Sequence, residues 1–85
     1  MEQRGESRQR PFRRERYQVP DDVQQAIRGR GLQEAYNARP PYQRNDYIGW
    51  ITGAVRPATR QKRLDQMLDE LAAGHGYMNL KWRPS

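Results

Sequence analysis

Apolar residues recur three and four positions apart along most of this chain, the spacing that places side chains on one face of a helix. The first such stretch opens on Asp21 and Asp22, whose charges favour a helix N-terminus, and closes at Gly29 or Gly31. A short second stretch ends before Pro40, because the residue preceding a proline disfavours helix. The apolar positions of these two predicted helices are Val23, Ala26, Ile27, Leu32, Ala35 and Tyr36.

Two longer helices are predicted over residues 41–55 and from Pro57 or Thr59 to Ala73, with Gly74 as the C-cap of the second. The connection around Pro57 is short, so we expect these two helices to form an antiparallel pair. No alternating strand pattern of useful length occurs. The sequence therefore predicts an all-α fold, a small bundle of four short helices that ends in an antiparallel pair. The predicted core positions of that pair are Tyr47, Ile48, Ile51, Val55, Leu64, Met67, Leu68 and Leu71.

The two ends of the chain do not follow this pattern. Residues 1–17 hold six Arg and three Glu, and they contain too little apolar surface to offset the chain entropy of folding. We therefore predict a disordered basic tail over 1–17 and a single helical domain over 18–85. Within that domain, residues 76–83 are expected to pack onto the helices as an extended strip. The apolar side chains of this strip are Tyr77, Leu80 and Trp82.

Composition excludes several classes of protein. The 85 residues contain no cysteine, which rules out disulfides and thiolate metal sites. Sixteen Lys and Arg against ten Asp and Glu give a net charge of +6, and hydrophobic residues make up only 34%. No run approaches the roughly 18 apolar residues of a membrane span, and the first 17 residues lack the apolar region of a secretory signal. We expect a cytoplasmic monomer.

The sequence offers little for catalysis. Its one histidine, His75, lies between two glycines in a predicted loop. One histidine and scattered carboxylates do not make a metal site, and no glycine-rich phosphate loop follows a strand. We expect no enzyme, with no catalytic residue, metal or cofactor.

Two arginines open the core-facing stripes of the long helices, where a leucine would be expected. A cation in the first turn of a helix also opposes the helix dipole, so Arg44 and Arg60 need a physical reason. One interpretation is capping across the antiparallel pair, with Arg60 on the carbonyls of residues 54–55 and Arg44 on the last turn, residues 70–74. The other is an anion site, in which the guanidinium groups bind a carboxylate or a phosphate.

Further cations gather at the junction of the same helices, where Arg56, Arg60, Lys62 and Arg63 lie within eight residues. Such a cluster can attract nucleic acid or an acidic partner, or it can be a solvated face. The basic tail can bind phosphates as well, with Phe12 and Tyr17 stacking on bases.

Three residues of the helix over 41–55 allow two interpretations each. Trp50 lies at the edge of the apolar stripe, where it packs on the core or contacts a ligand. Gly49 and Gly53 lie four apart on the opposite side. They let another backbone approach closely, from the C-terminal strip or a partner, or they are merely tolerated.

Four sequence elements occur in a recognisable order along the chain: VPDD from Val19, RNDYIGWI from Arg44, AVRPATRQKRL from Ala54 and LAAG from Leu71. Over residues 19–74 this order resembles the YdeI/OmpD-associated family of bacteriocin-protection proteins. The residues that match the family motif include Arg44, Tyr47, Trp50, Thr59, Arg60 and Arg63.

The resemblance implies a small, non-enzymatic helical module that acts in bacterial resistance to bacteriocins or antimicrobial peptides through a protein or peptide partner. The alternative is a nucleic-acid-binding protein that uses the basic tail and the Arg56–Arg63 cluster. The candidate partner-binding or anion-binding residues are Arg44, Tyr47, Trp50, Arg56, Arg60, Lys62 and Arg63.

Overall fold

The computed structural model describes residues 17–84, and within them the fold is all-α. Its four helices are α2 (Asp21–Gly29), α3 (Gln33–Ala38), α4 (Pro41–Thr52) and α5 (Pro57–Ala73). The prediction of four helices is thereby confirmed. The predicted disordered tail, apart from Tyr17, lies outside the described residues.

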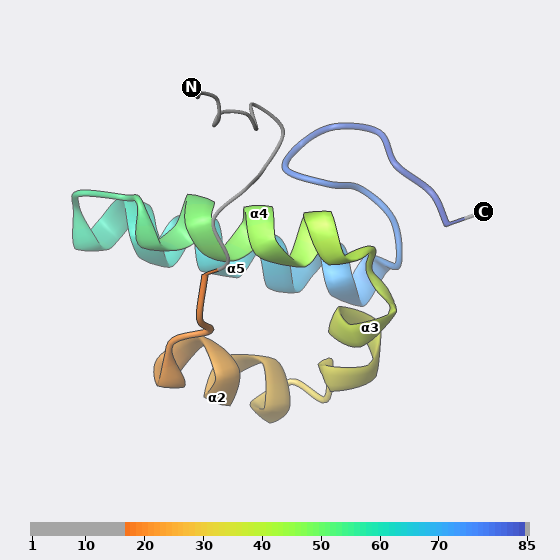
Figure 1. Ribbon diagram of the computed structural model, residues 1–85, viewed down its shortest axis with the longest axis horizontal. Coiled ribbons are helices and arrows are strands. Elements are labelled where there is room, and N and C mark those ends of the chain that lie inside the picture. Colours follow the sequence, from red (N-terminus) through yellow and green to blue (C-terminus); the bar gives the residue numbers. More distant parts are fainter. Residues whose placement is uncertain (1–16, 85) are drawn as a thin grey trace, which may run out of the picture.

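Helices α4 and α5 lie side by side as the predicted antiparallel pair (Figure 1). Their direction follows from two contacts, since Tyr47 bonds Glu70 while Trp50, further along α4, bonds Arg63, which is earlier on α5. Helices α2 and α3 pack against α5 and cover one side of the pair. The buried core combines all four helices: Val23, Ile27, Tyr36, Tyr47, Ile48, Ile51, Leu64, Met67, Leu68 and Leu71.

Glycines end two of the helices as the sequence predicts. Gly31 has a φ of 68° and Gly74 a φ of 80°, the left-handed conformation that a residue following a helix commonly adopts. After Gly31, the amide of Leu32 donates to the carbonyl of Ile27 at 2.9 Å, which closes the end of α2. The left-handed turn at Gly74 directs the chain back toward α4.

Helix α4 is shorter than predicted, and Val55 is not a core residue. The helix ends at Thr52, and Val55 is 96% exposed in the connection to α5. Arg56 is extended, with φ −94° and ψ 137°, because it precedes Pro57. The chain therefore leaves the helix before Val55, so the stripe at 47, 48 and 51 does not continue into the connection.

Candidate functional site

The segment after α5, residues 74–84, folds back along α4, and we call it the C-terminal loop (Figure 1). Tyr77 and Leu80 exchange both backbone hydrogen bonds, at 2.9 and 2.8 Å. Between them, Met78 and Asn79 have φ values of 51° and 71°, as in a type I′ turn. The segment thus contains a tight two-residue turn, which the prediction of an extended strip did not include.

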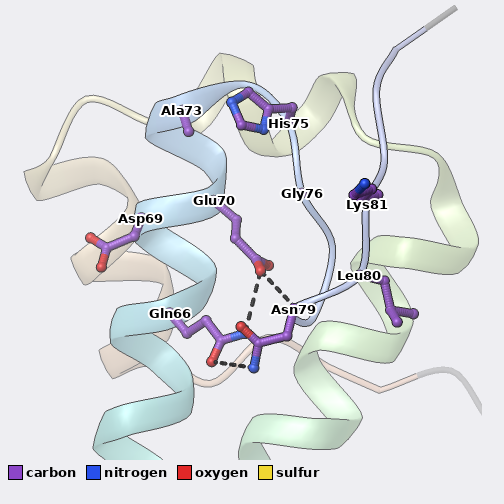
Figure 2. Close-up of a pocket in the computed structure, with 9 residues that line it drawn as sticks. All are labelled: Gln66, Asp69, Glu70, Ala73, His75, Gly76, Asn79, Leu80 and Lys81. Carbon is purple, nitrogen blue, oxygen red and sulfur yellow. Dashed lines mark hydrogen bonds between the residues drawn. The ribbon is translucent and has the colours of Figure 1, made fainter.

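Glu70 of α5 holds this turn in place. Its carboxylate accepts the amides of Met78 at 2.8 Å and Asn79 at 2.9 Å, and it also accepts bonds from the Tyr47 hydroxyl and from Gln66. Figure 2 shows the Glu70 side chain reaching from α5 to the turn. Successive amides in left-handed turns make such an anion-binding concavity, and here the anion belongs to the protein itself.

The two groups of the buried Tyr47–Glu70 contact titrate away from their ordinary values. Partial burial raises the pKa of Glu70, but the hydrogen bonds from Tyr47, Asn79, Met78 and Gln66 outweigh it and leave this pKa below 4.5. Burial, reinforced by the neighbouring carboxylate, raises the pKa of Tyr47. At neutral pH the Tyr47 phenol therefore keeps its proton and donates a hydrogen bond to the charged Glu70 carboxylate.

Arg39 holds the other end of the C-terminal loop. Its guanidinium is buried, donates to the carbonyl oxygens of Gly76 at 2.5 Å and Glu70 at 3.0 Å, and lies 4.4 Å from the centre of the Trp82 ring. It also donates to the fully buried Gln43 at 3.2 Å. A cation at the C-terminus of α5 interacts favourably with the helix dipole and supplies donors for terminal carbonyls.

Sequence reasoning missed Arg39, which it treated only as the residue before a proline. The capping role predicted for Arg44 belongs to Arg39 instead. Arg44 is half-buried, and its Nε donates to the carbonyl of Arg39 at 3.1 Å, not to the last turn of α5. No local pattern indicates this role, because Arg39 and the Glu70 carbonyl that it bonds are 31 positions apart in the sequence.

An apolar groove runs between the turn of the C-terminal loop and α4, and we call it the aromatic groove. The Tyr17 ring lies directly on Gly49, where a Cβ atom would come within 2.6 Å of it. The missing side chain at Gly49 thus makes room for the Tyr17 ring. The close approach of another backbone, one of the interpretations of Gly49 and Gly53, does not occur at Gly49. Leu80 on the opposite side is 63% exposed, and Tyr17 is 45% exposed. The lining residues are Tyr17, Asp46, Gly49, Trp50, Tyr77, Met78 and Leu80.

The floor of the aromatic groove is made of packed and hydrogen-bonded side chains. Tyr77 packs edge-on against Tyr47 and Tyr42, with ring centres 5.4 and 6.0 Å apart, and its hydroxyl donates to Asp46 at 2.6 Å. Tyr17 is fixed by its backbone amide, which donates to Asn45 at 2.8 Å. Aromatic rings in edge-to-face contact and a satisfied carboxylate make a preformed surface.

A second groove lies on the other side of the C-terminal loop, between the loop and α5 (Figure 2). Leu80 lines both grooves, while Lys81 and the exposed His75 line only this one. The remaining lining residues are Gln66, Asp69, Glu70, Ala73, Gly76 and Asn79. Residues 17–84 contain no group of three or more His, Asp or Glu side chains that could hold a metal ion.

Of the residues predicted as a binding site, the structure brings Tyr47, Trp50 and Arg63 together along the seam between α4 and α5. Arg63 donates to the Trp50 carbonyl at 2.7 Å and stacks on its ring at 5.3 Å, while Tyr47 lies 6.4 Å from the same ring. Tyr47 is fully buried, whereas Trp50 is half-buried and lines the aromatic groove. Trp50 is therefore the one of the three that a ligand in this groove can contact.

The basic cluster at the α4–α5 junction is partly neutralised. Arg60 forms a two-bond ion pair with Asp22 of α2, at 2.6 and 3.1 Å, so it does not cap the carbonyls of residues 54–55 as predicted. Arg63, bonded to Trp50, fills that capping role one turn further along α5. Arg56 and Lys62 are exposed and form no ion pair within residues 17–84. Nucleic-acid binding through this cluster and the tail stays a prediction.

The Asp22–Arg60 pair predicts a small effect on stability. Hydrogen bonding to Arg60 holds the pKa of Asp22 below its usual value, yet the pair is exposed to solvent. We expect Arg60→Ala to lower the free energy of unfolding by less than about 1 kcal/mol. A cap on helix carbonyls would cost about 1–3 kcal/mol. Urea unfolding followed by circular dichroism separates the two, and a loss above about 2 kcal/mol would contradict this assignment.

Within residues 17–84, no helix has the length and hydropathy to cross a bilayer. The comparisons with known proteins give one family. The model of the family described as "Bacteriocin-protection, YdeI or OmpD-Associated" matches residues 16–74, a range that contains all of α2 to α5. No curated protein and no solved structure matches the chain. The match covers most of the chain and confirms the resemblance seen in its motifs, so this protein belongs to the YdeI or OmpD-associated family of bacteriocin protection.

Proposed function

We propose that this chain is a non-enzymatic binding module of the bacterial cytoplasm that contributes to bacteriocin protection by holding an apolar segment of a protein or peptide partner. The observation that carries the proposal is the aromatic groove. It exposes large apolar side chains, Leu80 and Tyr17 above all, beside packed aromatic rings. Contiguous exposed apolar surface with a polar rim is typical of interaction sites.

The polar groups around the aromatic groove favour binding over chemistry. The Asp46 carboxylate accepts a bond from Tyr77, the amides of Met78 and Asn79 are bonded to Glu70, and the Trp50 carbonyl accepts from Arg63. These groups are committed to holding the fold. What the groove offers a ligand is mainly ring faces and aliphatic carbon, which bind by excluding water.

Survival of cells under bacteriocin challenge tests this proposal, with Leu80→Ser as the groove variant. Leu80 is 63% exposed, so its replacement should leave the fold intact. Cells that carry the wild-type chain should survive better than cells without it, and Leu80→Ser should remove most of that advantage. The matched control is Val55→Ser, because Val55 is also an exposed aliphatic residue but lies in the α4–α5 connection. Equal survival with both variants would contradict the assignment of the aromatic groove, and no protection by the wild type would contradict the function.

A further inference from the structure

We infer that the aromatic groove is covered by the chain's own residues 10–16, with the Phe12 ring against Leu80 and an arginine beside Asp46. This inference rests on the proposed function and adds regulation to the same site, because a partner must displace the segment before it binds. It follows from the place where the segment joins the fold, from its sequence and from the charge of the groove.

Residues 10–16 join the fold at the edge of the aromatic groove. Tyr17, the residue that follows them, lines this groove with its ring on Gly49. The backbone amide of Tyr17 donates to Asn45 at 2.8 Å, and Asn45 directly precedes Asp46 on α4. The peptide bond to residue 16 is therefore held beside the groove. A segment attached there by a short length of chain has an effective concentration on the order of millimolar at the groove.

Phe12 is the first large apolar residue on the N-terminal side of Tyr17, and it is the one phenylalanine of the chain. It lies five positions before Tyr17, and five residues of chain span at most about 18 Å. Phe12 can therefore turn back into a groove that Tyr17 itself lines. Because Leu80 is 63% exposed and Tyr17 is 45% exposed, an aromatic ring packed on them removes apolar surface of both from water.

The charges of the segment and of the groove are complementary. Within residues 17–84, Asp46 is the one charged residue that lines the aromatic groove. Its carboxylate accepts the Tyr77 hydroxyl at 2.6 Å, and a neutral phenol leaves the negative charge in place. Residues 10–16 contain four Arg and one Glu, so they bring three more positive than negative charges to this carboxylate. Complementary charge of this kind favours a basic occupant and sets its orientation.

A docked segment makes the groove selective. It lowers the apparent affinity of the groove for any partner in proportion to the fraction of chains in which the groove is open. Weakly binding apolar peptides are then excluded, and only a partner that binds better than Phe12 gains access. Removal of the Phe12 ring should therefore strengthen the binding of an added ligand, whereas removal of Leu80 should abolish it.

A spin label placed near Phe12 tests the docking in the full-length chain. The chain has no cysteine, so Gln9→Cys provides a single attachment site for a nitroxide. We expect the label to weaken the NMR methyl signals of Leu80 severalfold, and Phe12→Ser to restore most of that intensity. Both chains tether the label to Tyr17 by the same number of residues, so tethering alone predicts no difference. Phe12→Leu is the matched control, because it keeps an apolar side chain and should retain the broadening.

A second pair of variants tests the charge. Asp46→Asn removes the negative charge but keeps an oxygen that accepts the Tyr77 hydroxyl, and it should restore part of the Leu80 signal of the spin-labelled chain. Asp69→Asn makes the same change in the second groove and should leave the broadening as it is. Added salt should act like Asp46→Asn, because it screens the attraction between the segment and the groove. Equal effects of the two variants would contradict the placing of an arginine beside Asp46.

A free peptide with the sequence of residues 10–16 measures the competition. Titration calorimetry at low salt should show that it binds the Phe12→Ser chain severalfold more tightly than the wild-type chain, whose own segment competes for the groove. Leu80→Ser, added to Phe12→Ser, should remove this binding, while Val55→Ser in the same background leaves it unchanged. Both positions are exposed, but only Leu80 lines the groove.

Three results would overturn the docking of residues 10–16. The first is a Leu80 signal that Phe12→Ser does not restore, and the second is a free peptide that binds both chains equally or binds neither. The third comes from mixing a spin-labelled chain with an isotope-labelled chain that carries no spin label. Loss of Leu80 intensity in that mixture, equal to the loss within one chain, would mean that the segment of a second copy occupies the groove.

The survival test of Leu80→Ser keeps this inference separate from the proposed function. If docking fails while Leu80→Ser cells lose protection, the proposed function stands and the groove is open without its own segment. If docking holds while Leu80→Ser cells survive bacteriocin as well as the wild type, the segment covers a groove that has no part in protection. That result would overturn the proposed function and, with it, the regulation inferred for the site.

Discussion

Arg39→Met is expected to lower the free energy of unfolding by about 3 kcal/mol, because it removes three buried or partly buried hydrogen bonds, to the carbonyls of Gly76 and Glu70 and to the Gln43 side chain. Arg39 is 4% exposed, and its guanidinium donates to the carbonyls of Glu70 and Gly76. Methionine replaces the aliphatic stem of the side chain but not its guanidinium, so the loss reports the hydrogen bonds together with the cation–π contact to Trp82. For so short a chain this is a large part of a total stability on the order of 5 kcal/mol.

Arg44→Met is the matched control for Arg39→Met. Arg44 lies one turn into α4, is half-buried, and makes a single bond to the Arg39 carbonyl. We expect a loss of about 1 kcal/mol or less. Urea unfolding measures both variants, and the amide signal of Gly76 in NMR spectra reports whether the C-terminal loop detaches. Equal losses for the two variants, or an unchanged Gly76 signal in Arg39→Met, would contradict the role assigned to Arg39.

The helices of this fold could be predicted because their determinants are local. In α5, Leu64, Met67, Leu68 and Leu71 recur at helical spacing, and Gly74 supplies the left-handed end. The short connection after α4 then requires the antiparallel pair. Each of these features is contained in a window of fewer than about 20 residues, the range over which periodicity is informative.

The arrangement of charged groups could not be predicted in the same way. A helical pattern places Arg44 and Arg60 on core-facing stripes, but it does not say which residue of another helix each will meet. Arg60 meets Asp22, which is 38 positions away, and Arg39 meets Gly76, which is 37 positions away. Such contacts depend on where α2 and the C-terminal loop dock, and local spacing carries no information on docking.

The aromatic groove also depends on how distant segments of the chain dock. Its sides come from Tyr17, from α4 and from the turn at Met78 and Asn79, three segments that are distant in sequence. The turn itself was not predictable from its residues, since methionine is unusual at a positive φ. The conformation is held by Glu70, whose carboxylate both amides bind. Glu70 therefore determines the shape of the groove without lining it.

That dependence predicts a large effect for Glu70→Gln. An amide offers one acceptor oxygen in place of two, so the amides of Met78 and Asn79 and the Tyr47 hydroxyl can no longer all be satisfied. We expect the free energy of unfolding at neutral pH to fall by about 2–3 kcal/mol. The control is Asp69→Asn, the same change one residue earlier, at an exposed carboxylate with a single ion pair to Arg30. Its expected effect is below about 1 kcal/mol.

The pH dependence of stability in the same two variants tests whether the negative charge of Glu70 causes the stabilisation. The pKa of Glu70 is lower in the folded chain than its ordinary value of 4.5, so near and below that pH the unfolded chain binds more protons. The stabilisation by Glu70 is complete above about pH 4.5 and is lost as the pH falls through the folded pKa. Urea midpoints measured between neutral and acidic pH should therefore fall more steeply for the wild type and Asp69→Asn than for Glu70→Gln. If the three curves stay parallel, the C-terminal loop is held by something other than the Glu70 carboxylate.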